Sequence, residues 1–167
     1  MSFLNRVSQT LHEEHCATIA LMERLEKLVV KHRPDNPPDA ASADIARLLS
    51  DVATGVAQEV NRHFDFEENE LFSYLDALGD EAIGQHLTME HAAMRPLGAQ
   101  VSALAREAAA DGFDVARWTM FRRLGQELCE RMLSHVQKEE MALLPILEDA
   151  MDPDTEARLY QEYSDSV

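Results

Sequence analysis

The sequence predicts an all-α protein, an up-down-up-down antiparallel four-helix bundle with a short C-terminal extension. Four long stretches carry apolar residues at helical spacing, and the breaks between them are short and rich in proline, glycine and aspartate. No stretch shows the alternation and β-branched enrichment typical of strands, and we find no internal repeat. Helices of about 28 to 36 residues joined by short loops run antiparallel to their neighbours, which predicts the bundle.

The first predicted helix runs from about Phe3 to Lys31, and the prolines that begin at Pro34 end it. The second opens near Ser42, where Ser42 or Asp44 could cap its free N–H groups, and it ends at Gly79.

The third predicted helix begins around Asp80 and runs to Gly112, with Pro96 inside it as an expected kink. The fourth spans about Val115–Ala150. We therefore assign residues 1–151 to the bundle and residues 152–167 to a short C-terminal helix or tail.

Charge and hydropathy exclude several classes of protein. The chain has 15 Lys and Arg residues against 31 Asp and Glu residues, a net charge of -16, and no basic stripe, so we expect no nucleic-acid partner. No apolar run approaches the ~20 residues that cross a bilayer, and no signal peptide is evident, so we expect a cytoplasmic protein without a membrane partner. Cys16 and Cys129 form no CxxC pair, which argues against a thiolate zinc site.

Six of the seven histidines fall within predicted helices, and every long helix carries at least one. These six are His12 and His15, then His63, then His86 and His91, then His135. His63 precedes Glu67 by four residues, and His135 precedes Glu139 by four, so each pair lies on one helix face. A single pair of this kind in so acidic a chain is also consistent with a weak surface ion pair.

Counting along the helices from each turn, at about 1.5 Å per residue, places four imidazoles at one common level. They are those of His15, His63, His91 and His135, with Glu67 and Glu139 one turn away. Burying these groups unpaired costs several kcal/mol, so they need mutual hydrogen bonds or a cation. A polar network without metal is the alternative, but imidazole with bridging carboxylate suits iron or another divalent transition metal.

Three segments resemble the hemerythrin-like, or HHE cation-binding, domain family: HFDFEENELF (63–72), MEHAAM (89–94) and HVQKEEMALLPIL (135–147). The resemblance extends from His15 to about Glu148. It implies a non-haem di-iron centre with an oxo, hydroxo or water bridge, at which dioxygen, nitric oxide or a small anion could bind. Zinc or manganese could occupy the same ligands. The residues it implies are four terminal ligands, His15, His63, His91 and His135, and two bridging carboxylates, Glu67 and Glu139.

The chain departs from the oxygen-carrying hemerythrins, which have His-x3-His on the third helix and His-x4-Asp on the fourth. Here His86 and His91 are five residues apart, so His86 becomes a ligand only if a π-bulge turns it inward. Glu139 is preferred to Glu140 as the fourth-helix carboxylate. His12 is a further candidate beside the site, although an exposed position is the simpler expectation.

Two classes of function remain open at this point. The favoured one is a metal-dependent binding or sensing protein for dioxygen or nitric oxide. The alternative is a redox enzyme or repair factor that reduces peroxide or nitric oxide or donates iron to iron–sulfur clusters, with a reductant protein as partner. Iron buffering is a third. The sequence indicates no oligomeric state.

Overall fold

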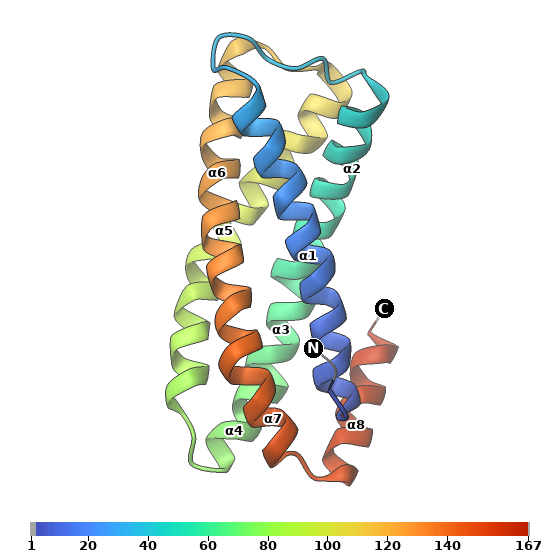
Figure 1. Ribbon diagram of the computed structural model, residues 1–167, viewed down its shortest axis with the longest axis vertical. Coiled ribbons are helices and arrows are strands. Elements are labelled where there is room, and N and C mark those ends of the chain that lie inside the picture. The colour runs from blue at the N-terminus through green and yellow to red at the C-terminus, as the bar shows by residue number, and fades with distance from the viewer. Residues whose placement is uncertain (1–2, 167) are drawn as a thin grey trace.

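The computed structural model describes residues 3–166, which are almost entirely helical (Figure 1). No strand occurs within these residues, so the all-α prediction is confirmed. Five helical runs follow one another along the chain. Their elements are α1 (Arg6–Lys31), α2 (Ala43–Gln58), η1 (Glu59–His63), α3 (Phe64–Phe66), η2 (Glu67–Leu71), α4 (Phe72–Ala77), α5 (Ala82–Asp111), α6 (Val115–Lys138), η3 (Glu139–Leu143), α7 (Leu144–Ala150) and α8 (Pro153–Asp165).

Capping residues explain where the helices begin and end. α1 starts later than the predicted Phe3, because the Asn5 side chain accepts hydrogen bonds from two N–H groups of the first turn. Gly79 and Gly112 adopt φ of 87° and 80° and terminate the second and third runs in a conformation that other residues rarely adopt. Ser42 stands at the predicted N-cap position of α2, but its side chain makes no capping hydrogen bond.

The four long runs lie side by side along the length of the molecule (Figure 1). α1 packs against α2 and α6, and α5 packs against the same two helices. The short α8 packs against α1 near the end of the molecule where the chain begins. The predicted C-terminal segment is therefore a helix that contributes Leu159 and Tyr163 to the apolar core.

The apolar core has two parts, and each of the four long runs contributes to both; the second run shows the boundary most closely. Phe64 belongs to the larger part, which also contains Trp118 and Phe121. Phe66 belongs to the smaller part, with Tyr163. The buried polar residues described below lie at this boundary.

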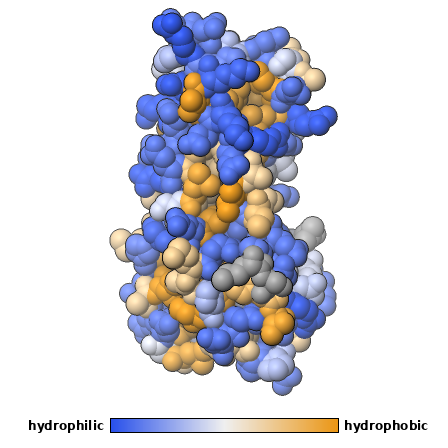
Figure 2. Space-filling model, in the orientation of Figure 1, coloured by the Kyte–Doolittle hydropathy of each residue, from blue (hydrophilic) through white to orange (hydrophobic). Residues whose placement is uncertain are grey.

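Hydrophilic side chains cover most of the face in Figure 2, and apolar side chains gather near its middle. No helix among residues 3–166 is long and apolar enough to cross a bilayer.

Candidate metal centre

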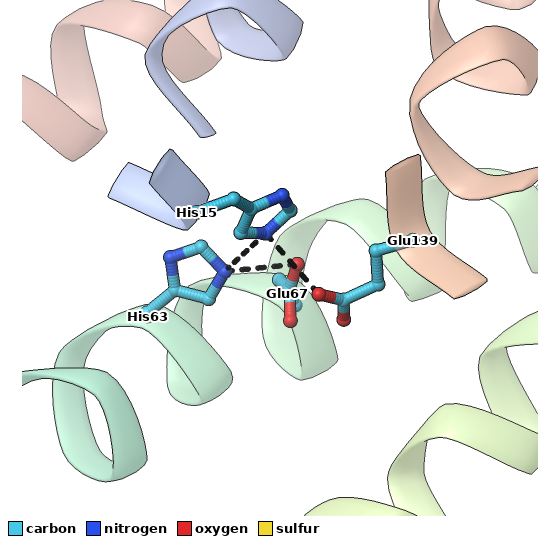
Figure 3. A group of neighbouring side chains, drawn as sticks. All are labelled: His15, His63, Glu67 and Glu139. Atoms are coloured by element: carbon cyan, nitrogen blue, oxygen red, sulfur yellow. Dashed lines mark hydrogen bonds and ion pairs between the residues drawn. The ribbon is translucent and has the colours of Figure 1, made fainter. Parts of the chain in front are cut away.

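Six polar side chains from the four long runs meet at the boundary between the two parts of the core. Each is at most 2% exposed. Figure 3 shows four of them converging, with the imidazoles of His15 and His63 beside the carboxylates of Glu67 and Glu139. The full cluster comprises His15 from α1, His63 from η1, Glu67 from η2, His91 from α5, His135 from α6 and Glu139 from η3. The structure thus brings together the four histidines that counting along the helices places at one level and the two glutamates expected one turn away.

Three π-helical segments adjoin the cluster, and a cluster residue stands at one end of each. η1 ends at His63, η2 begins at Glu67 and η3 begins at Glu139. A π turn widens the helix and rotates the residues that follow it, and such turns are frequent at functional sites. The sequence raised a π-bulge only for the third long helix, where α5 instead runs as a regular α-helix from Ala82 to Asp111.

The ligand atoms form two groups of four, each with all its members within 4.8 Å of one another. The groups are His15, His63, Glu67 and Glu139, and Glu67, His91, His135 and Glu139. Within each group the two imidazoles face each other through Nε2, at 3.3 Å for His15 and His63 and 2.9 Å for His91 and His135. Because Glu67 and Glu139 belong to both groups, the two sites share their carboxylates.

A second layer of four glutamates surrounds the imidazoles. Each glutamate accepts a hydrogen bond from the Nδ1 atom of a histidine on a neighbouring run. The pairs are Glu14 with His63 (2.8 Å), Glu68 with His91 (2.8 Å), Glu90 with His135 (2.9 Å) and Glu140 with His15 (2.6 Å). Runs one to four are thereby linked in a closed ring, because each run supplies a glutamate to the histidine of the next.

Each outer glutamate has a further partner of its own. Arg62 and the Tyr163 hydroxyl donate to Glu14, Arg95 donates to Glu68, Lys138 to Glu90, and His12 lies 2.8 Å from Glu140. Burial raises the pKa of Glu14, but hydrogen bonds from His63, Tyr163 and Arg62 outweigh it and bring the pKa to about 2. Glu14 is therefore ionised at neutral pH and holds the His63 ring in orientation.

The hydrogen bonds of the outer layer fix which ring nitrogen faces the centre with a lone pair. A neutral imidazole that donates from Nδ1 has an acceptor at Nε2. All four carboxylate oxygens of Glu67 and Glu139 are buried without a hydrogen-bond partner, although imidazole nitrogens lie as close as 2.9 Å. Acceptor atoms alone converge on the centre, and such a set is stabilised by cations. These residues therefore fit bound metal ions.

Protons compete with metal for the same Nε2 atoms. Burial lowers the pKa of His15, but its ion pair with Glu139 and its hydrogen bond with Glu140 outweigh burial and raise the pKa to about 9. Burial likewise opposes the charged form of His91, but its ion pairs with Glu139 and Glu67 outweigh burial and raise its pKa to about 9. A metal ion that binds these rings must displace a proton from them.

His86 is not brought into the cluster. Its side chain is 59% exposed, and its Nε2 lies 3.3 Å from Glu90, since the regular turn of α5 directs His86 and His91 to different faces. Glu140 serves in the outer layer, and His12 contacts it there while remaining only partly buried.

Sequence reasoning considered Glu140 only as an alternative to Glu139 and missed the other three outer glutamates and the motifs that contain them. A Glu-His pair occurs as Glu14-His15 and again as Glu90-His91. The motif His-x3-Glu-Glu likewise occurs at residues 63–68 and again at 135–140. A glutamate adjacent to each of four cluster residues was the available signal.

An all-helical chain with a buried cluster of histidines and glutamates of this geometry defines a class of helical cation-binding proteins. The family model described as the hemerythrin HHE cation-binding domain matches residues 6–147, and matches again over residues 82–165. The chain belongs to this family, which confirms the resemblance drawn from the sequence. No curated protein matches the chain.

Proposed function

We propose that the cluster holds two iron ions as a non-haem di-iron centre, and that the protein binds or senses dioxygen or nitric oxide there. The observation that carries this proposal is the pair of four-residue groups that share Glu67 and Glu139. Carboxylates common to two sites can join two cations, and the combination of imidazole with carboxylate suits iron while also accommodating zinc or manganese. Family membership supports cation binding.

When bound, iron would supply redox chemistry and open positions for a small ligand, because four protein donors are fewer than an octahedral ion accepts. The protein's own residues restrict access and fix orientation. Phe64 stacks on the His91 ring with centroids 3.8 Å apart and meets the His135 ring edge-on at 5.5 Å. This phenyl ring closes the side of the cluster that faces the larger part of the core.

The same open positions favour a second candidate function, a redox enzyme or repair factor that reduces peroxide or nitric oxide or donates iron to iron–sulfur clusters. Each group has only two imidazoles, because His86 lies at the surface. A reductant protein would be the partner of such an enzyme, whereas a carrier or sensor needs only dioxygen, nitric oxide or a small anion.

We also infer that the four long runs form the up-down-up-down four-helix bundle expected from the sequence. The ring of hydrogen bonds supports this arrangement, because Glu140 of the fourth run reaches His15 of the first. The packing of α1 against both α2 and α6 supports it as well.

One experiment tests the proposal and separates its two forms. Protein loaded with Fe²⁺ under argon is desalted, its metal content is measured by mass spectrometry, and its ultraviolet–visible spectrum is recorded before air, in air and after evacuation. We expect two iron ions per chain. Bands that appear in air and vanish on evacuation support reversible binding, and bands that persist support the redox enzyme. Failure to retain any iron contradicts the proposal.

A further inference from the structure

A cavity of about 150 Å³ lies between α1 and the second helical run, and it reaches the cluster at His63. Its polar lining includes Glu14, Thr18, Glu59 and Arg62. The four other large cavities described for residues 3–166 have no cluster histidine in their lining. This cavity therefore extends from the groove between α1 and α2 to one side of the His63 ring.

Glu59 is the unexplained residue of this cavity. It is only 6% exposed, and its Oε2 accepts a hydrogen bond from the Thr18 hydroxyl at 2.9 Å. Its Oε1 is buried without a hydrogen-bond partner. A buried carboxylate oxygen in this state costs free energy that only a donor or a cation recovers. Glu59 is also the first residue of η1, so the widened π turn begins where this side chain enters the cavity.

The charges around the cavity favour a cation over an anion. Arg62 is already engaged, because it donates to Glu14 and to the Tyr163 carbonyl oxygen. The carboxylates of Glu14 and Glu59 line the cavity together with the His63 ring.

The second half of the molecule provides an internal comparison. The corresponding groove, between α5 and α6, contains a cavity of about 260 Å³ that is lined by Glu90 but not by His135. Three residues after the cluster imidazole it has Met94, 1% exposed, where the first groove has Thr18. α6 is a regular helix there, and Glu130 is exposed at its surface. The second groove thus lacks both the inward carboxylate and the opening to a histidine.

We propose that the groove between α1 and α2 is the route by which hydrated divalent cations enter and leave the centre, with Glu59 as a transient ligand beside His63. The inference rests on the proposed metal-binding function and adds the route and its residue. One carboxylate oxygen suits transit, because a site of long residence would need the three or four donors found at the centre. The net charge of -16 raises the concentration of cations near every groove, so specificity resides in Glu59.

The test compares Glu59→Gln with Glu130→Gln, an identical substitution in the second groove. Protein loaded with Fe²⁺ under argon is mixed with excess chromophoric Fe²⁺ chelator, and the rate of metal release is followed by absorbance. Entry and exit share one path, so release reports on both directions. We expect release to be at least about tenfold slower in Glu59→Gln, a barrier increase of about 1.4 kcal/mol, and to be unchanged in Glu130→Gln. Both variants should retain two iron ions per chain at equilibrium.

Thr18→Met provides a second variant that keeps the Glu59 carboxylate, although it removes the hydroxyl that donates to Oε2, and it should slow release by narrowing the groove to resemble its counterpart. Equal rates in the wild type, Glu59→Gln and Thr18→Met would overturn the inference. Equal slowing in Glu59→Gln and Glu130→Gln would also overturn it, because surface charge would then explain the effect. A wild type that retains no metal overturns the proposed function, whereas two bound ions with unchanged variant rates overturn this inference alone.

Discussion

Glu67 belongs to both groups of ligand atoms, whereas His63 belongs to one, and this difference predicts the metal content of two variants. Glu67→Gln keeps the volume of the side chain but removes a shared negative charge, so it weakens both sites. His63→Ala removes a ligand from the first site and leaves His91 and His135 in place. We expect two ions per chain in the wild type, about one in His63→Ala and close to none in Glu67→Gln.

The magnitude follows from linkage between binding and folding. At free metal about 100 times the dissociation constant, each bound ion adds about 2.7 kcal/mol to the free energy of unfolding. For a chain of this size, 1 kcal/mol corresponds to about 2–4 °C in Tm. Metal loading should therefore raise Tm by about 11–22 °C in the wild type and by about half as much in His63→Ala, with almost no gain in Glu67→Gln.

The assay is calorimetry with metal and with chelator, paired with metal content after desalting. Glu70→Gln is the matched control, because Glu70 lies on the same π segment with its side chain 38% exposed. It should behave as the wild type. Equal loss of metal in His63→Ala and Glu67→Gln would refute the sharing of Glu67 between two sites, and full metal content in Glu67→Gln would refute its role as a ligand.

Three further predictions concern pH, the outer layer and the core. The raised pKa of His15 stabilises the metal-free protein fully below pH 6.5 or so, and this contribution is lost as the pH rises through about 9. Calorimetry should therefore show a larger gain in Tm on metal loading at pH 9 than at pH 6. An equal gain at both pH values would contradict competition between protons and metal for His15. Tyr163→Phe removes the hydroxyl that donates to Glu14, and Glu14 in turn orients His63. Titration against a competing chelator should therefore show about tenfold weaker binding of one ion. Unchanged affinity for both ions would exclude a role of Tyr163 in orienting His63. Trp118→Ala, a fully buried ring far along the chain from the cluster, should cost about 3–5 kcal/mol in denaturant unfolding while metal content stays at the wild-type value, and metal loss would show that the core and the centre are coupled.

The inner cluster was predictable because helical spacing holds over long distances. Counting 1.5 Å per residue from each turn is sufficient to place His15 and His91 at one level. A histidine that takes the place of an apolar residue on the buried face of a helix can also be recognised in the sequence. The ends of the second and third runs were equally accessible, since Gly79 and Gly112 terminate them by adopting positive φ.

The outer layer was not predictable by the same reasoning. Consecutive residues on a helix point about 100° apart, so a glutamate next to an inward histidine faces a neighbouring helix and not the centre. Which histidine Glu14 reaches depends on how α1 and the second run pack, and this information lies in no single segment. The π segments were missed for a related reason. The π turn that begins at Glu59 contains no proline or glycine that would mark it in the sequence, and only the packed structure shows that it buries Glu59 and His63.

The two halves of the cluster repeat the same inner ligands, yet their surroundings differ. In the first half, Tyr163 of α8 supports Glu14, and Glu59 enters the cavity beside His63. In the second half, Lys138 supports Glu90, and the apolar Met94 is buried where the first half has a hydroxyl. The ring of outer glutamates nevertheless links all four runs, because each glutamate accepts a hydrogen bond from the histidine of the next run. Two ions bound here are therefore expected to exchange at different rates, although they share the carboxylates of Glu67 and Glu139. Such a difference would let one metal respond to a ligand while the other stays bound.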